Sequence, residues 1–173
     1  MPPMQMSLPV KPRVVLVLAI LLLTVACDQS TKRWARATLT AGTTRSLVQG
    51  HVQLILAENE GAFLGLGENL PSRARFLIFT ILVGIALVLA FRWLVGPSRP
   101  PHQILSVGLL IGGGTGNVID RISRHGAVTD FLVLRYGAVT TGIFNVADVF
   151  VTVAACSMLL SLWKRKQHGA QND

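Results

Sequence analysis

Four long apolar runs set the strongest constraint on what this chain can fold into. They cover residues 14–27, 76–91, 104–119 and 143–163. A helix needs about 20 mainly apolar residues to cross a bilayer, and only the last run reaches that length unaided. The second run reaches it through Arg92, whose long stem can carry its charge to the interface, and the third by starting near His102. The first must continue through Asp28 to Trp34, which places Asp28 at the outer membrane boundary.

The composition supports an integral membrane protein. Apolar residues make up 51% of the 173 residues, and charged residues only 14%. A net charge of +8 could indicate a nucleic-acid partner, but the lysines and arginines stand in short clusters beside apolar runs, as membrane flanks do. We therefore expect no nucleic-acid binding and one all-α membrane domain over residues 1–173. Its four predicted spans are 14–34, 74–95, 102–120 and 143–163, and residues 1–10 and 167–173 are expected to be disordered tails.

The segments between the spans predict how the chain is oriented. Residues 38–71 and 121–141 lie on one side, and the partial alternation over residues 51–56 predicts a small β-sheet on the membrane surface. Basic clusters at Lys11 and Arg13 and at residues 164–166 favour cytoplasmic termini. The sheet and the outer ends of the spans are then extracytoplasmic.

Two aspartates, Asp130 and Asp148, stand at the outer ends of the last two spans. Hydrocarbon solvates a carboxylate poorly, so each is a candidate functional residue. Two nearby carboxyl groups repel each other when both are ionised, so their pKa values move apart and the pair holds one proton. The ionised group can then activate water, and the protonated group can protonate the leaving amine. The pair therefore predicts an aspartic peptidase, with the proton belonging to the pair. Asp130 could instead be a turn or N-cap residue, whereas Asp148 would lie too deep for capping in a helix that starts at Ile143.

Other polar residues lie on shared helical faces, either with one of these aspartates or with each other. Asn145 precedes Asp148 by three positions, so it could orient the aspartate or simply begin the helix. Asn117 shares a face with Asp120 and with Arg121. Arg121 could neutralise Asp120 in a structural ion pair or hold the active-site region together, and the spacing leaves these possibilities open.

Small residues form a stripe on the third span at Gly108, Gly112 and Gly116. In lipid this pattern is typical of close helix packing. Cys27 and Cys156 both fall inside apolar runs, where cysteine behaves as a small hydrophobe, so no disulfide is expected.

An alternative interpretation of the N-terminus is a secretory signal that ends in a lipid-modified Cys27, since residues 23–27 resemble such a site. Three further apolar spans follow, which favours a first membrane helix.

Five motifs occur in order along the chain. They are Asp-Gln-Ser-Thr-Lys at 28–32, Asn-Glu-Gly-Ala-Phe at 59–63, Gly-Gly-Gly-Thr-Gly-Asn-Val-Ile-Asp-Arg at 112–121, Val-Thr-Asp-Phe at 128–131 and Phe-Asn-Val-Ala-Asp at 144–148. Together they resemble the motif set of signal peptidase II, the bacterial prolipoprotein signal peptidase, over residues 14–163. The resemblance implies four transmembrane helices with a small extracytoplasmic sheet, and Asp130 and Asp148 as the catalytic dyad. It implies substrate-binding or site-supporting roles for Asp28, Lys32, Asn59, Gly61, Asn117, Asp120, Arg121 and Asn145.

The resemblance also implies the reaction and its setting. The enzyme would cut a diacylglyceryl-modified prolipoprotein on the N-terminal side of the lipidated cysteine, in the bacterial cytoplasmic (inner) membrane and in contact with membrane lipid. It would act as a monomer, without cofactor or metal, and be inhibited by globomycin-type cyclic peptides. Thr129 departs from the aliphatic residue more common in the family, and residues 136–143 lack the usual aromatic and proline residues, which bears on substrate fit.

Other functions find less support. The four histidines, His51, His102, His125 and His168, lack metal-ligand spacing. A transporter or channel with intramembrane carboxylates is the alternative function, but it requires polar residues that continue towards the cytoplasmic side. A purely structural membrane subunit would not explain five costly polar motifs.

Overall fold

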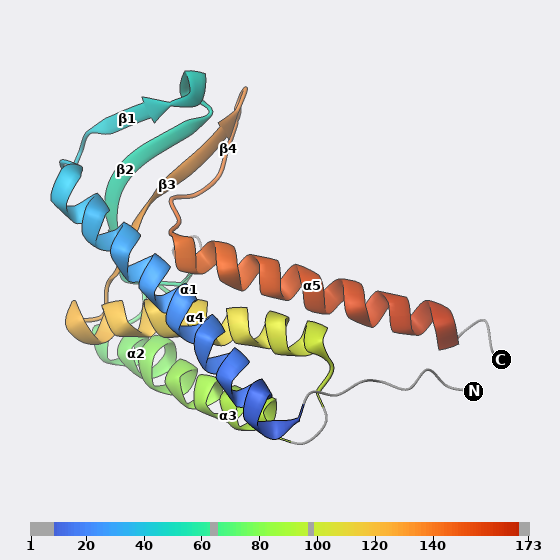
Figure 1. The fold of residues 1–173 in the computed structure, drawn as a ribbon. Helices are drawn as coiled ribbons and strands as arrows, with labels where there is room; N and C mark the ends of the chain where they lie inside the picture. Colours follow the sequence, from blue (N-terminus) through green and yellow to red (C-terminus); the bar gives the residue numbers. More distant parts are fainter. Residues whose placement is uncertain (1–8, 63–65, 97–98, 170–173) are drawn as a thin grey trace.

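The computed structural model describes residues 9–62, 66–96 and 99–169. Figure 1 shows a bundle of long helices with a small sheet at one end. In chain order the elements are α1 (Val10–Thr38), β1 (Thr44–Leu47), β2 (Val52–Asn59), α2 (Ser72–Phe76), a π-helical stretch (Leu77–Leu82), α3 (Val83–Val95), α4 (Pro101–Ser123), β3 (Val128–Tyr136), β4 (Val139–Thr140) and α5 (Val146–Gly169). A single 3₁₀ turn, Val48–Gly50, joins β1 to β2.

Within the described residues, three helical stretches are long and apolar enough to cross a membrane. They are α1, the continuous stretch Ser72–Val95 and residues Val146–Lys164 of α5. The prediction of a mainly helical membrane protein with a small sheet is thus confirmed in outline. A fourth long helix, the 23-residue α4, contacts α1, α3 and α5. Because α4 faces protein on several sides, glycines and polar residues replace part of the apolar surface that a lipid-facing helix needs.

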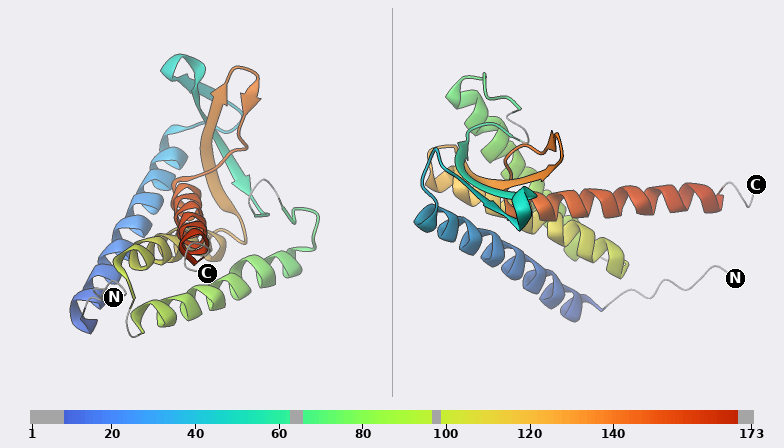
Figure 2. Two further views of the ribbon diagram at one scale, coloured as in Figure 1. Left: turned by 90° about the vertical axis from the view of Figure 1, so that its right-hand side faces the viewer. Right: turned by 90° about the horizontal axis from the view of Figure 1, so that it is seen from above.

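The helices alternate in direction. The starts of α1 and α4 lie at one end of the bundle with the ends of α3 and α5, and the sheet lies at the other (Figures 1 and 2). We call the end without the sheet the base. There the buried guanidinium of Arg13 donates to the Val95 carbonyl at 3.1 Å, which ties the start of α1 to the end of α3.

The glycine stripe allows α1 and α4 to pack closely. A Cβ at Gly108 would lie 3.1 Å from Ile20 Cγ2, and a Cβ at Gly116 would lie 3.0 Å from Asp28 Cγ. An alanine at Gly116 would displace the Asp28 carboxylate, whereas one at Gly108 would press only on the Ile20 side chain, so the predicted close packing is confirmed.

The sheet is antiparallel, in the order β1-β2-β3-β4. A register shift between Leu54 and Ala57 precedes the pairing of Ala57 with Asp130. Ahead of α5, Phe144 pairs with Leu132 of β3 through backbone hydrogen bonds in both directions. The end of β2 and the start of α5 are therefore both held against β3.

Helix boundaries differ from the predicted spans. The last helix begins at Val146 rather than at Ile143, because residues 143–144 precede it in extended pairing with β3. Residues 167–169 continue α5, so that part of the predicted disordered tail is wrong. Val10, also assigned to a tail, begins α1. The remaining tail residues 1–8 and 170–173 lie outside the described part of the chain.

Candidate active site

The two predicted dyad residues lie at the sheet end of the bundle and line one cavity of about 800 Å³. Asp130 belongs to β3 and is 3% exposed, while Asp148 is half-buried in the first turn of α5. After α4, His125 and Gly126 adopt positive φ angles of 53° and 100° and reverse the chain. This turn brings β3, and Asp130 with it, back over the end of α4.

Asn145 joins the two aspartates. Its Nδ2 donates to Asp130 Oδ1 at 2.6 Å, and its Oδ1 accepts the Asp148 backbone N–H at 3.0 Å. In return, Asp148 Oδ2 accepts the Asn145 backbone N–H at 3.1 Å. This reciprocal pair is a capping box, so the expectation that Asp148 lies too deep to cap a helix is wrong. Asn145 both begins the helix and contacts the other aspartate.

The remaining oxygen of Asp148 is held from α4. Asn117 Nδ2 donates to Asp148 Oδ1 at 3.0 Å. Asn117 Oδ1 accepts from Lys32 Nζ at 2.8 Å and from Asn145 Nδ2 at 3.2 Å. Since an ammonium can only donate, Lys32 fixes which way the Asn117 amide points.

The remaining oxygen of Asp130 faces the end of β2. Asn59 Nδ2 donates to Asp130 Oδ2 at 3.0 Å, and Asn59 Oδ1 accepts the Gly61 backbone N–H at 2.9 Å. Arg121 donates to the Gly61 carbonyl at 2.6 Å and stacks over Phe79, its guanidinium carbon 5.7 Å from the ring centroid. Asn59 and Gly61 therefore lie beside Asp130. Phe63 of the same motif lies outside the described residues.

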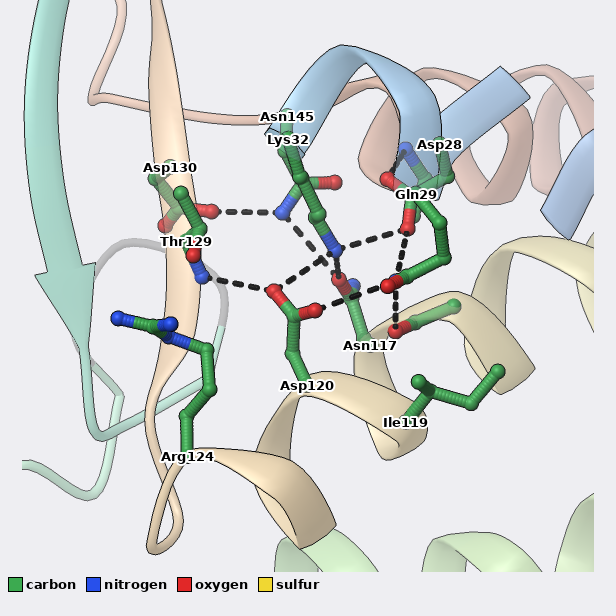
Figure 3. A network of polar contacts seen from close by, with 12 residues as sticks. Asp28, Gln29, Lys32, Asn117, Ile119, Asp120, Arg124, Thr129, Asp130 and Asn145 are labelled. Atoms are coloured by element: carbon green, nitrogen blue, oxygen red, sulfur yellow. Dashed lines mark hydrogen bonds and ion pairs between the residues drawn. The ribbon is translucent and has the colours of Figure 1, made fainter. Parts of the chain in front are cut away.

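A buried charge cluster lies behind the amides. Lys32 Nζ is 2.9 Å from Asp28 Oδ2 and 3.4 Å from Asp120 Oδ2, and none of the three side chains exceeds 1% exposure. Figure 3 shows these residues converging from α1 and α4 beside Asn117. The cation that pairs with Asp120 is therefore Lys32 rather than Arg121. Asp28 is fully buried among the helices.

Sequence reasoning missed Gln29. Its Nε2 lies 3.1 Å from Asp28 Oδ2, from Asp120 Oδ1 and from the Gly116 carbonyl. The available signal was its spacing of three residues from Lys32 on a helix, which places both on one face.

The surroundings of Asp130 raise its pKa towards neutrality. Burial raises the pKa of Asp130 to about 6, and the Asp148 charge also raises it. Hydrogen bonds from Asn145 and Asn59 oppose this rise but do not cancel it. A carboxyl group whose pKa lies near neutrality can both give and take a proton. Within the described residues, no three His, Cys, Asp or Glu side chains gather to hold a metal ion.

Comparison with known proteins gives a consistent result. The model of the signal peptidase (SPase) II family, Peptidase_A8, matches residues 20–164. The chain is 33% identical over 150 residues to the lipoprotein signal peptidase of Maridesulfovibrio salexigens, covering 85% of this chain and 94% of the relative. It is 32% identical over 156 residues to that of Oleidesulfovibrio alaskensis, covering 90% and 99%. A solved bacterial membrane enzyme, 22% identical, shares the fold with a TM-score of 0.76 over 95% of each chain. The chain therefore belongs to the signal peptidase II family.

Proposed function

We propose that the chain is an aspartic endopeptidase that removes the signal peptide from prolipoproteins, with Asp130 and Asp148 as its catalytic dyad. One observation carries the proposal. Two carboxyl groups from different elements line one cavity, and Asn145 donates to both, to Asp130 Oδ1 from its side-chain amide and to Asp148 Oδ2 from its backbone N–H.

The dyad can perform both proton transfers of peptide hydrolysis. The ionised carboxylate takes a proton from a water molecule whose oxygen attacks the scissile carbonyl carbon, while the protonated carboxyl donates to the carbonyl oxygen. A proton then passes to the amide nitrogen, the C–N bond breaks, and the new carboxyl and amine leave. The high pKa of Asp130 supports a single shared proton, which belongs to the pair.

The surrounding residues support the dyad. Asn117 and Asn145 orient the carboxyl groups through the hydrogen bonds described above. Arg121 holds the backbone at Gly61, so that Asn59 covers Asp130 from the outer side. If Asn59→Ala changed neither turnover nor substrate affinity, Asn59 would have no role in covering the cleavage site.

The rest of the cavity fits a lipidated substrate. Apolar side chains from three helices line it, among them Val83, Leu87, Leu110 and Val151. Such a wall suits acyl chains and an apolar signal helix, and supports cleavage on the N-terminal side of a diacylglyceryl-modified cysteine. Globomycin-type cyclic peptides would compete for the same cavity. One chain supplies every residue of the site, so the proposed enzyme acts as a monomer.

We assign α4 as a fourth span, with both termini cytoplasmic and the dyad near the extracytoplasmic face. Alternating helix directions and the basic clusters near each terminus support this orientation. The alternative transporter gains no support. Below the site, the buried residues Val17, Leu94, Ile104 and Ile111 form an apolar cluster where an ion path would need polar groups.

A cleavage assay in detergent tests the dyad, using a diacylglyceryl-modified precursor with the wild type, Asp130→Asn and Asp148→Asn. Each substitution keeps the shape of the side chain but removes its titration. Exposed Glu68 provides a matched control, since Glu68→Gln makes the same chemical change away from the site. We expect chelator-resistant cleavage by the wild type and the control, and none by either folded dyad variant. Robust cleavage by one variant would remove that residue from the dyad, and an inactive wild type would contradict the proposed function.

A further inference from the structure

Two buried carboxylates behind the dyad hold the backbone that carries it. Asp28 Oδ1 accepts the Ala147 N–H at 3.0 Å, and Asp120 Oδ2 accepts the Thr129 N–H at 3.0 Å. Ala147 and Thr129 are the residues immediately before the two aspartates of the proposed dyad. A charged acceptor strengthens each hydrogen bond.

Lys32 connects the two carboxylates. Its ammonium contacts Asp28 and Asp120, which come from different helices, and all three side chains are buried. Gln29 bridges the same two carboxylates from its side-chain nitrogen (Figure 3). Arg36, also on α1, donates to Thr129 Oγ1 at 2.8 Å, so α1 holds β3 at the same residue.

An aspartate side chain has only two rotatable bonds, so the position of its backbone largely decides where its carboxyl group lies. We propose that Asp28, Lys32 and Asp120 form a positioning triad that sets the separation of the two dyad carboxyl groups by holding the peptides that precede them. This inference rests on the proposed dyad. None of the three residues touches the substrate in this role.

The cost of the triad argues for a geometric purpose. Burying three charges is expensive, and apolar side chains of similar volume often stabilise a fold as well or better. The same two helices pack through apolar residues nearer the base. A charge cluster has few low-energy arrangements, so it fixes the two peptides more narrowly than apolar contacts would.

Gly116→Ala tests the triad without removing any charge. The new Cβ would lie 3.0 Å from Asp28 Cγ and would overlap its carboxylate, so Asp28 must shift. Gly108→Ala is the matched control, because it adds the same methyl group to the same stripe against Ile20. Asp120→Asn is a second variant that keeps the side-chain shape and loses the charge facing Lys32.

The readouts are kcat, KM and the pH dependence of cleavage of the lipidated precursor, measured on purified folded protein. For Gly116→Ala we expect kcat to fall about 100-fold with little change in KM, since a misplacement of about 1 Å can cost that much. The spacing of the two inflections of the pH profile should also change, because the repulsion between the dyad carboxyl groups depends on the distance between them.

Gly116→Ala moves the Asp28 carboxylate but removes no charged group near the dyad. Lys32 and Asp28 come from α1 and Asp120 and Arg121 from α4, while β2 and α5 present the amides of Asn59 and Asn145. A changed pH profile therefore reports geometry, which reduced folding alone would not alter. Gly108→Ala should retain the wild-type kcat and profile.

Several outcomes would overturn the triad. A wild-type kcat and pH profile in Gly116→Ala would do so, as would an equal loss of kcat in Gly108→Ala. If Gly116→Ala does not fold, the kcat of Asp120→Asn decides by the same criterion. If neither Gly116→Ala nor Asp120→Asn folds, the three residues stabilise the fold and the positioning role is rejected. The proposed function stands or falls separately, on whether Asp130→Asn and Asp148→Asn cleave.

Discussion

The two ends of the α1–α4 interface use the same glycine stripe but different chemistry. Near the base, Val17 of α1 and Ile104 and Ile111 of α4 form an apolar cluster with Leu94. At the sheet end, the same helices bury a lysine between two aspartates. Apolar packing tolerates small shifts, whereas hydrogen-bonded charges require one arrangement. The difference suggests that the base maintains the bundle and the sheet end sets the geometry of the site.

The largest effect is expected from Lys32→Met. Removing the ammonium leaves Asp28 and Asp120 as uncompensated buried carboxylates, which should lower the free energy of unfolding by about 3–5 kcal/mol. Thermal unfolding in detergent measures this. The double variant Lys32→Met/Asp120→Asn should recover part of the loss, because one of the stranded charges is gone. If Lys32→Met melted at the same temperature as the wild type, the buried charges at the sheet end would not require one arrangement, and the contrast with the base would be wrong.

The pH dependence of stability tests the burial of Asp130. Its pKa rises from 3.8 to about 6 on folding, so between these values the folded state keeps a proton that the unfolded state releases. The stabilising contribution of the protonated group is complete below about pH 4 and is lost as the pH rises through 6.

The wild type should therefore lose about 2–3 kcal/mol relative to Asp130→Asn between pH 4 and pH 7, and little more above it. Unfolding curves of both proteins over this range provide the measurement, and contributions from other groups cancel in the difference. A difference that stays constant with pH would contradict the raised pKa.

At the base, Ile104→Ala should lower the free energy of unfolding by about 2–3 kcal/mol through the cavity it leaves. The kcat of the folded fraction should equal that of the wild type, since Ile104 does not line the active-site cavity. Unfolding and cleavage are measured on the same preparation. A large fall in kcat would show that the base also controls the site.

The smallest effect is expected at the surface. Glu58 pairs with Arg124, and the Glu58 side chain is 53% exposed. Solvent weakens such a pair, so Glu58→Gln should change the free energy of unfolding by less than about 1 kcal/mol. The same unfolding assay detects the change, and a loss as large as that of Lys32→Met would mean that this pair belongs to the buried network.

Much of the site could be predicted from sequence because spacing on a helix is local. The three-residue separation of Asn145 and Asp148 allows the contact that they make, and the glycine stripe predicts close packing of the third span, for which the structure identifies α1 as a partner. Other features could not be predicted in this way. The partner of Asp120 is Lys32, 88 positions away, and no periodicity within one helix identifies a partner on another.

The predicted start of the last helix is wrong for a related reason. Residues 143–144 continue the apolar run, so composition assigns them to the helix, but Phe144 pairs with Leu132 and Asn145 caps the helix after it. Tertiary pairing outweighed the local pattern.

The sequence by itself determined that this chain is a helical membrane protein with an aspartate near each of its last two long apolar runs, because hydrophobic length and the cost of burying charge are properties of short segments. Only the tertiary structure decided that Asn145 joins the two aspartates, that Lys32 lies between Asp28 and Asp120, and that these carboxylates accept the N–H groups of the residues before Asp148 and Asp130. Those contacts depend on how helices and strands distant in sequence are placed against one another, and that placement is a property of the whole fold.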